Sequence, residues 1–211
     1  MVDKFLRQYI ETDILPLYDG FDAAHQRNHV DMVIDQSMDI AANMDVDKNM
    51  VYAIAAFHDT GLPVDRKTHH LVSGKIVREN MQLRDRFSVE QIVIMAPAWV
   101  AHTSSSDHEP RSIYGKIVAE ADRFINPDTI IVRTIQYGLA NYPDLDKEGH
   151  WRRTLQHLHE KYAEGGYLRL WFDNSPNMAR LQSLREIIKN EPLLREKFEH
   201  IYVRLTNPAS E

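Results

Sequence analysis

The chain contains no cysteine. Disulfides, thiolate metal ligands and cysteine nucleophiles are therefore excluded. Positive charge is also scarce, because the chain has 25 Lys and Arg residues and 31 Asp and Glu residues. The resulting net charge of −6 argues against a nucleic-acid partner bound on a broad basic surface. The longest nearly apolar run, Ile92 to Ala101, contains Pro97 and is too short to cross a bilayer. No apolar signal segment opens the sequence, so we expect a soluble, cytoplasmic protein without a membrane partner.

Histidine, by contrast, is abundant. The chain has 11 histidines, and seven of them fall between His25 and His108. Histidine is the commonest metal ligand in proteins and titrates close to neutral pH. Any single histidine can equally be a surface residue or a hydrogen-bonded core residue, so the argument depends on which histidines point inward together.

Apolar residues recur with a helical period along nearly the whole chain, and no segment alternates well enough to predict a strand. We therefore expect an all-α protein that forms one compact domain. Two local signals strengthen the prediction: Asp45 or Asp47 can cap a helix that ends at His58, and Ser88 with Gln91 forms a capping box. Helices are expected over about residues 5–14, 29–40, 51–58, 69–81, 92–100 (kinked at Pro97), 112–124, 130–139, 147–163, 176–189 and 192–205.

Three of these helices direct polar side chains toward the core. His29 and His58 each continue the apolar face of their own helix, Asp59 follows where the second helix ends, and Asp122 lies on a stripe with apolar neighbours. A buried carboxylate without a partner is costly, and a metal ion removes that cost. A site of two histidines and two aspartates suits Mn²⁺, Fe²⁺, Zn²⁺ or Mg²⁺ and leaves positions open for water and substrate. The residues alone leave an alternative open, in which Asp122 pairs with Arg123 or another base at the surface and both histidines are core residues.

The order His, His-Asp, Asp on consecutive helices resembles the HD-domain superfamily of metal-dependent phosphohydrolases. Three strings carry the likeness: Ala-Ala-Phe-His-Asp-Thr-Gly (55–61), His-His-Leu-Val-Ser-Gly (69–74) and Lys-Ile-Val-Ala-Glu-Ala-Asp-Arg-Phe (116–124). The resemblance implies an HD core over about residues 21–126. The helical extension over about 127–211 is similar to the tails of uncharacterised bacterial HD hydrolases.

The resemblance also implies which residues form the site. It implies one divalent ion, of Mn, Fe, Mg, Zn or Ni, held by His29, His58, Asp59 and Asp122. His70 and His102 are the expected catalytic histidines beside Asp59, whereas nothing in the sequence directs His69 inward. A phosphate substrate needs positive charge nearby, and the candidates are Arg123, Lys116 and Arg66. For each of these three, a solvated helix face or a salt bridge is the alternative.

The expected activity is hydrolysis of a phosphoester or phosphoanhydride in a nucleotide or another small phosphorylated metabolite, with Asp59 and the metal holding the attacking water. The turn Thr60-Gly61-Leu62-Pro63 disfavours the branches that hydrolyse (p)ppGpp and cyclic-di-GMP. Two other functions stay open: a di-iron oxygenase of the HD type, with His70 and His102 as extra ligands, and a non-catalytic sensor that binds a nucleotide or metal. A homo-oligomer is compatible with the sequence.

Overall fold

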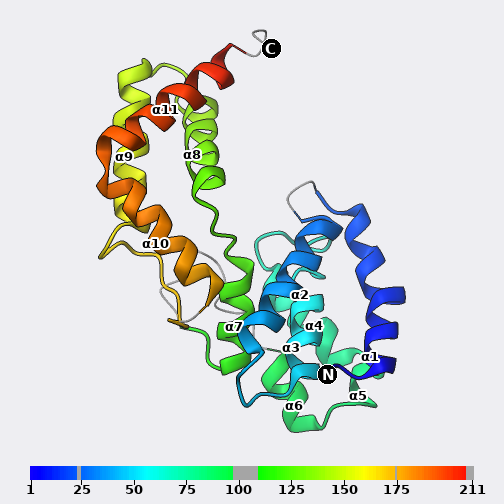
Figure 1. The fold of residues 1–211 in the computed structure, drawn as a ribbon. Helices are drawn as coiled ribbons and strands as arrows, with labels where there is room; N and C mark the ends of the chain where they lie inside the picture. The colour runs from blue at the N-terminus through cyan, green and yellow to red at the C-terminus, as the bar shows by residue number, and fades with distance from the viewer. Residues whose placement is uncertain (23–24, 97–108, 174, 208–211) are drawn as a thin grey trace. The chain divides into compact units, whose positions relative to one another are not determined.

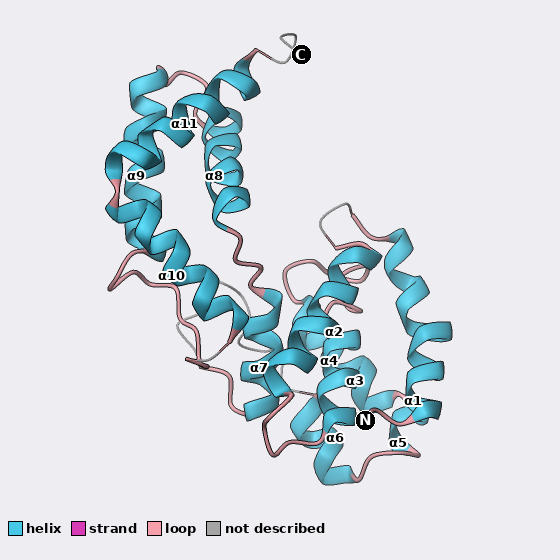
Figure 2. Cartoon of the chain, in the orientation of Figure 1, coloured by secondary structure: helices cyan, strands magenta, loops and turns pink. Residues whose placement is uncertain are grey.

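The computed structural model describes residues 1–22, 25–96, 109–173 and 175–207. Helices are the only regular elements in these ranges (Figures 1 and 2), which confirms the all-α prediction. None of the helices there combines the length and apolar character that a membrane crossing requires. Pro97 and His102 lie outside the described residues, so the expected kink at Pro97 stays a prediction.

The backbone divides into two compact units, Met1–Arg123 and Phe124–Glu211. The sequence predicts one compact domain made of an HD core and a helical extension over about residues 127–211, and the structure gives this extension a hydrophobic core of its own. The chain therefore divides where one core ends and the next begins. The boundary lies close to residue 126, the expected end of the HD core.

The N-terminal unit is built around α2 (Arg27–Ala41), α3 (Lys48–Phe57) and α7 (Ile113–Asp122), which pack against one another. The chain enters this unit through α1 (Lys4–Tyr9), whose last turn continues into a π-helix and then a 3-10 helix. The remaining elements are η1 (Ile10–Ile14), η2 (Leu15–Gly20), α4 (His69–Glu79), α5 (Met81–Arg84) and α6 (Val89–Met95).

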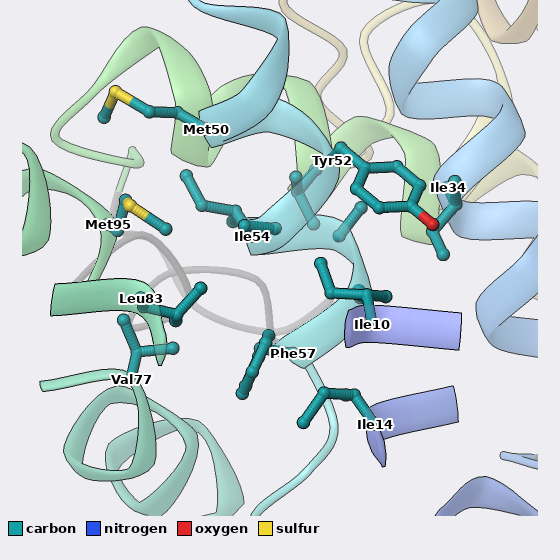
Figure 3. Close-up of a cluster of buried hydrophobic side chains, with 14 of the residues drawn as sticks. Ile10, Ile14, Ile34, Met50, Tyr52, Ile54, Phe57, Val77, Leu83 and Met95 are labelled. Atoms are coloured by element: carbon teal, nitrogen blue, oxygen red, sulfur yellow. The ribbon is translucent and has the colours of Figure 1, made fainter. Parts of the chain in front are cut away.

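Helix α3 is the centre of this unit, because every residue from Met50 to Phe57 is buried. Its N-terminus is capped by the Asp47 carboxylate, which accepts a 2.8 Å hydrogen bond from the Asn49 amide. Ile54 and Phe57 lie among apolar side chains of the surrounding elements, including Leu83 (Figure 3). Whatever follows the C-terminus of α3 is thereby placed in the interior.

Local sequence signals explain several helix boundaries. The capping box of Ser88 and Gln91 is formed at the start of α6, as predicted. The expected helix over residues 69–81 is shorter than predicted: it ends at Glu79, because the Asn80 side chain accepts a hydrogen bond from the Leu83 amide and starts α5. The apolar pattern of the sequence does not predict this break.

The C-terminal unit consists of four helices that pack around a second core. Helix α8 (Pro127–Asn141) contacts the other three, and α10 (Pro176–Lys189) contacts both α9 (Lys147–Tyr162) and α11 (Glu191–Thr206). The rings of Trp151 and Phe198 lie 5.3 Å apart, centroid to centroid, within this core. All four helices lie close to their predicted ranges.

The turn after α3 packs directly against the start of α4, and Gly61 makes this possible. A Cβ atom at Gly61 would lie 2.2 Å from the backbone oxygen of His69 and 2.8 Å from the backbone nitrogen of Ser73. Because both neighbours are backbone atoms, neither can rotate away. A side chain at this position would have to push α4 away from the turn.

We therefore expect Gly61→Ala to destabilise the protein by about 2 kcal/mol or more, since overpacking a rigid site forces backbone shifts. Urea unfolding followed by circular dichroism measures the change. Gly20→Ala is the matched control, because a Cβ atom at Gly20 meets nothing within 4 Å and should change stability by less than about 0.5 kcal/mol. Equal effects of the two substitutions would contradict the proposed close contact.

Candidate metal centre

The end of α3 brings two histidines and an aspartate together. The Nε2 atoms of His29 and His58 are 3.1 Å apart. The Oδ2 atom of Asp59 lies 3.1 Å from Nε2 of His58 and 3.5 Å from Nε2 of His29. These three residues offer ligand atoms close enough to one another to hold a metal ion.

Asp122, at the C-terminus of α7, faces the same histidines. Its Oδ1 atom lies 3.3 Å from Nε2 of His29 and 3.9 Å from Nε2 of His58. His29 comes from α2, His58 and Asp59 from the end of α3, and Asp122 from α7, the three helices that form the middle of the unit. The structure therefore brings together all four residues that the sequence analysis assigns to the metal.

The hydrogen bond on the far side of the His58 ring determines which of its nitrogens is available to the cluster. Nδ1 of His58 lies 2.8 Å from the backbone oxygen of Ala55. A carbonyl oxygen only accepts hydrogen bonds, so Nδ1 carries the hydrogen. In the neutral ring, Nε2 therefore presents a lone pair to Asp59 and His29, and such a backbone partner is typical of a metal-binding histidine.

His69 joins the cluster in the same manner. Its Nδ1 atom lies 2.8 Å from the backbone oxygen of Arg66, and its Nε2 atom lies 3.5 Å from Oδ1 of Asp59. The side chain is only 15% exposed. The sequence analysis does not direct His69 inward, so the structure corrects that expectation.

The two histidines expected to be catalytic are His70 and His102. His70 is half-buried next to His69, with ring centroids 5.7 Å apart, and its proposed role stays a prediction. His102 lies outside the described residues.

The pKa values of His29 and His58 indicate how strongly the cluster attracts positive charge. Burial lowers the pKa of His29, but the Asp122 and Asp59 carboxylates outweigh burial and raise it from 6.5 to about 9. Burial likewise opposes the charged form of His58, yet Asp59 raises the pKa of that ring above 6.5. The cluster thus binds protons more tightly than isolated histidines do, and a divalent cation satisfies the same acceptors.

Tyr18 and Ser73 hold the turn that carries His58 and Asp59. The Tyr18 hydroxyl donates to the backbone oxygen of Ala56 at 2.9 Å and accepts from the Asp59 amide at 3.3 Å. Burial, reinforced by the charge of Asp59, raises the pKa of Tyr18 well above its usual range. On the opposite side, the Ser73 hydroxyl donates to the backbone oxygen of His58 and accepts from the Gly61 amide, each at 2.9 Å. Sequence patterns gave no signal for either role.

The three expected substrate-binding cations differ in their surroundings. Arg66 is 67% exposed and forms a 2.7 Å ion pair with Asp22, which also contacts His25 at 2.9 Å. Lys116 pairs with Glu109. Arg123 caps the end of α7, and burial lowers the pKa of its guanidinium against the opposing charges of Asp122 and Glu120.

The donor set fits a divalent metal ion. Two imidazole nitrogens and two carboxylate oxygens approach one another from three helices. In the neutral His58 ring, the lone pair of Nε2 faces these neighbours. Nitrogen and oxygen ligands of this kind suit Mn²⁺, Fe²⁺, Zn²⁺ and related ions.

Residues 27–126 match the family model described as HD domain, and this range contains all four converging residues together with His69. No curated protein and no solved structure matched the chain.

The raised pKa of His29 predicts how stability depends on pH in the metal-free protein. The folded-state pKa lies above the usual 6.5, so the stabilisation is complete below about pH 6.5 and is lost as the pH rises through about 9. The difference between 6.5 and about 9 corresponds to an upper limit of about 3 to 4 kcal/mol. Melting temperatures of chelator-treated protein should therefore fall across this range.

His29→Gln is the control, because it removes one of the two imidazoles with a raised pKa, and the profile should become shallower. Mn²⁺ must displace the proton from His29, so the stabilisation by Mn²⁺ should grow over the same pH range. A profile that is equally steep in wild type and in His29→Gln would show that the carboxylates do not raise the pKa of His29.

Proposed function

Because residues 27–126 place this chain in the HD-domain superfamily, which implies a metal-dependent hydrolase, we propose that it is a phosphohydrolase acting on a nucleotide or another small phosphorylated metabolite. One observation carries the proposal: the convergence of His29 Nε2, His58 Nε2, an Asp59 oxygen and an Asp122 oxygen at the meeting point of three helices. Such a cluster supplies ligands for a metal and still leaves coordination positions for water and substrate.

In this proposal His29, His58, Asp59 and Asp122 hold one divalent ion, of Mn, Fe, Mg, Zn or Ni. When bound, such an ion lowers the pKa of a water molecule and polarises the phosphoryl group. The chain fixes the ligands beforehand: the Ala55 carbonyl orients the His58 ring, and Tyr18 and Ser73 hold the turn. This rigidity matters because catalysis requires ligands that do not reorganise during the reaction.

Asp59 and His69 are the groups proposed to handle protons. Oδ2 of Asp59 faces the metal-binding histidines, and Oδ1 faces Nε2 of His69. A carboxylate held in this way can accept a hydrogen bond from the attacking water and so orient it. His69 can hold a proton beside that oxygen, close to where charge develops on the substrate.

Arg66 and Arg123 are proposed to bind the substrate phosphate. Arg66 is exposed, and its present partner Asp22 is exposed as well, so a phosphate dianion can compete with this carboxylate for the guanidinium. Arg123 directly follows Asp122 at the end of α7. Lys116 is a weaker candidate because Glu109 already neutralises it.

The position of His69 also supports a second candidate function. Both oxygens of Asp59 face imidazole nitrogens on different elements, an arrangement from which a carboxylate can bridge two ions. A pair of irons in such a site would support oxidation of carbon by dioxygen instead of phosphate hydrolysis. Iron content with oxygen consumption distinguishes this function from Mn²⁺-dependent phosphate release.

Asp122→Ala should abolish retention of Mn²⁺ after reconstitution and desalting, because it removes one of four ligands. Elemental analysis of wild type and variant checks this result. The matched control is Asp35→Ala, an exposed aspartate on α2 that should leave metal content unchanged. Phosphate release from a panel of nucleotides and sugar phosphates should fall with the metal, and an active, metal-loaded Asp122→Ala protein would disprove the assignment.

His69→Gln should lower kcat for phosphate release by about a hundredfold or more, the usual contribution of a proton-transferring group, while one equivalent of metal stays bound. The reason is that His69 contacts Asp59 but is not among the four proposed ligands. His70→Gln is the paired variant and should have the smaller effect. A change from two retained ions to one in His69→Gln would instead indicate a dinuclear site.

A further inference from the structure

The C-terminal unit contains a pocket that the proposed hydrolase function does not use. Its volume is about 460 Å³, and its walls come mainly from α8 and α9. Every residue that lines it belongs to the segment from Phe124 onward, and none is a candidate ligand or catalytic residue of the metal centre.

The lining is basic without compensating acids. Among the residues that the structure describes, it includes Arg133, Arg153 and His157, and no aspartate or glutamate. Within the described ranges, no salt bridge neutralises either arginine. In a chain with a net charge of −6, two unpaired guanidinium groups in one pocket are a local concentration of positive charge that favours an anion.

Arg153 is held in a fixed orientation. Its Nη1 atom donates to the backbone oxygen of Thr134 at 3.0 Å. Its guanidinium carbon lies 5.0 Å from the ring centroids of both Tyr137 and Tyr142. Gly138 provides the space, because a Cβ atom there would lie 3.2 Å from Nη1. The Thr134 oxygen occupies one of five N–H donors, so an oriented guanidinium remains to bind a ligand.

Tyr162 and His157 add no charge to the pocket at neutral pH. Burial raises the pKa of Tyr162 to about 12, so its hydroxyl keeps its proton and can donate a hydrogen bond. Burial, with the nearby charges of Lys161 and Arg153, lowers the pKa of His157 below 6.5. The positive charge of the pocket is therefore that of the two arginines.

We propose that this pocket binds the phosphate group of a small organic phosphate. A carboxylate offers two coplanar oxygens, which one guanidinium satisfies, whereas a phosphate offers three acceptor oxygens in different directions. Arg133 on α8, Arg153 on α9 and the Tyr162 hydroxyl supply donors from several sides. The rings of Phe124, Tyr137 and Tyr142, which are 39%, 54% and 47% exposed, offer apolar surface for the organic part of the ligand.

Inorganic pyrophosphate is the first probe, because it contains the phosphate chemistry alone. Its binding to the full chain is measured by isothermal titration calorimetry. Arg153→Gln and Arg133→Gln should each weaken binding by about tenfold or more, since each removes charge-assisted hydrogen bonds. Arg152→Gln is the matched control: it is exposed, is next to Arg153 on α9 and does not line the pocket, so it should change the affinity by less than about twofold.

Arg153 also packs on two tyrosines, so its substitution can weaken the fold. Arg133→Gln, at an exposed position, tests the pocket without that effect.

Asp122→Ala distinguishes binding in this pocket from binding at the metal centre. Pyrophosphate binding that survives Asp122→Ala and is lost in the pocket variants supports the proposal, whether or not the protein hydrolyses phosphates. Binding that is lost in Asp122→Ala and kept in both arginine variants belongs to the metal centre and overturns it. Equally tight binding of citrate would overturn the phosphate assignment, and so would the absence of pyrophosphate binding at millimolar concentration.

Discussion

Two imidazole nitrogens and a carboxylate oxygen face one another within about the length of a hydrogen bond, in the interior of the protein, at the end of a helix that is buried from Met50 to Phe57. These atoms are acceptors unless they are protonated, and burying such a cluster without positive charge is costly. The fold therefore requires either protons or a cation at this point. Asp122 and Asp59 raise the pKa of His29 to about 9, so below that pH a proton on His29 supplies positive charge in the metal-free protein.

The hydrogen bonds around the cluster satisfy the end of a buried helix. The last carbonyl groups of a helix have no partners within it, and in the interior something other than water must satisfy them. Tyr18 donates to the Ala56 oxygen and Ser73 to the His58 oxygen. The same hydrogen bonds fix the turn that carries Asp59 and Gly61. They therefore satisfy the end of the helix and orient the metal-binding residues at the same time.

The sequence predicts this site where helical periodicity determines the direction of a side chain. His29 and Asp122 lie within or at the end of regular helices, and His58 continues the buried face of α3. His69, by contrast, starts a helix after an irregular turn, and there the period does not determine which of two adjacent histidines faces Asp59. The contact depends on α4 packing against Gly61, a tertiary feature without a local signal. Periodicity also predicts the helices of residues 127–206 but not their separate core, because it does not show which helices pack together.

The distribution of charge in the N-terminal unit bears on how a phosphate would be bound there. Arg66 pairs with Asp22, Lys116 pairs with Glu109, and Arg123 is half-buried next to Asp122. Each expected cation thus has an acidic neighbour, so little uncompensated positive charge comes from these side chains. The proposed metal ion must then provide most of the electrostatic attraction for a phosphate. In the described part of the C-terminal unit the situation is the reverse: Arg133 and Arg153 line a pocket that has no acidic side chain, and side chains alone supply the charge of the proposed anion site. The two proposed phosphate sites therefore differ in their source of charge, and removing the metal should affect only the first.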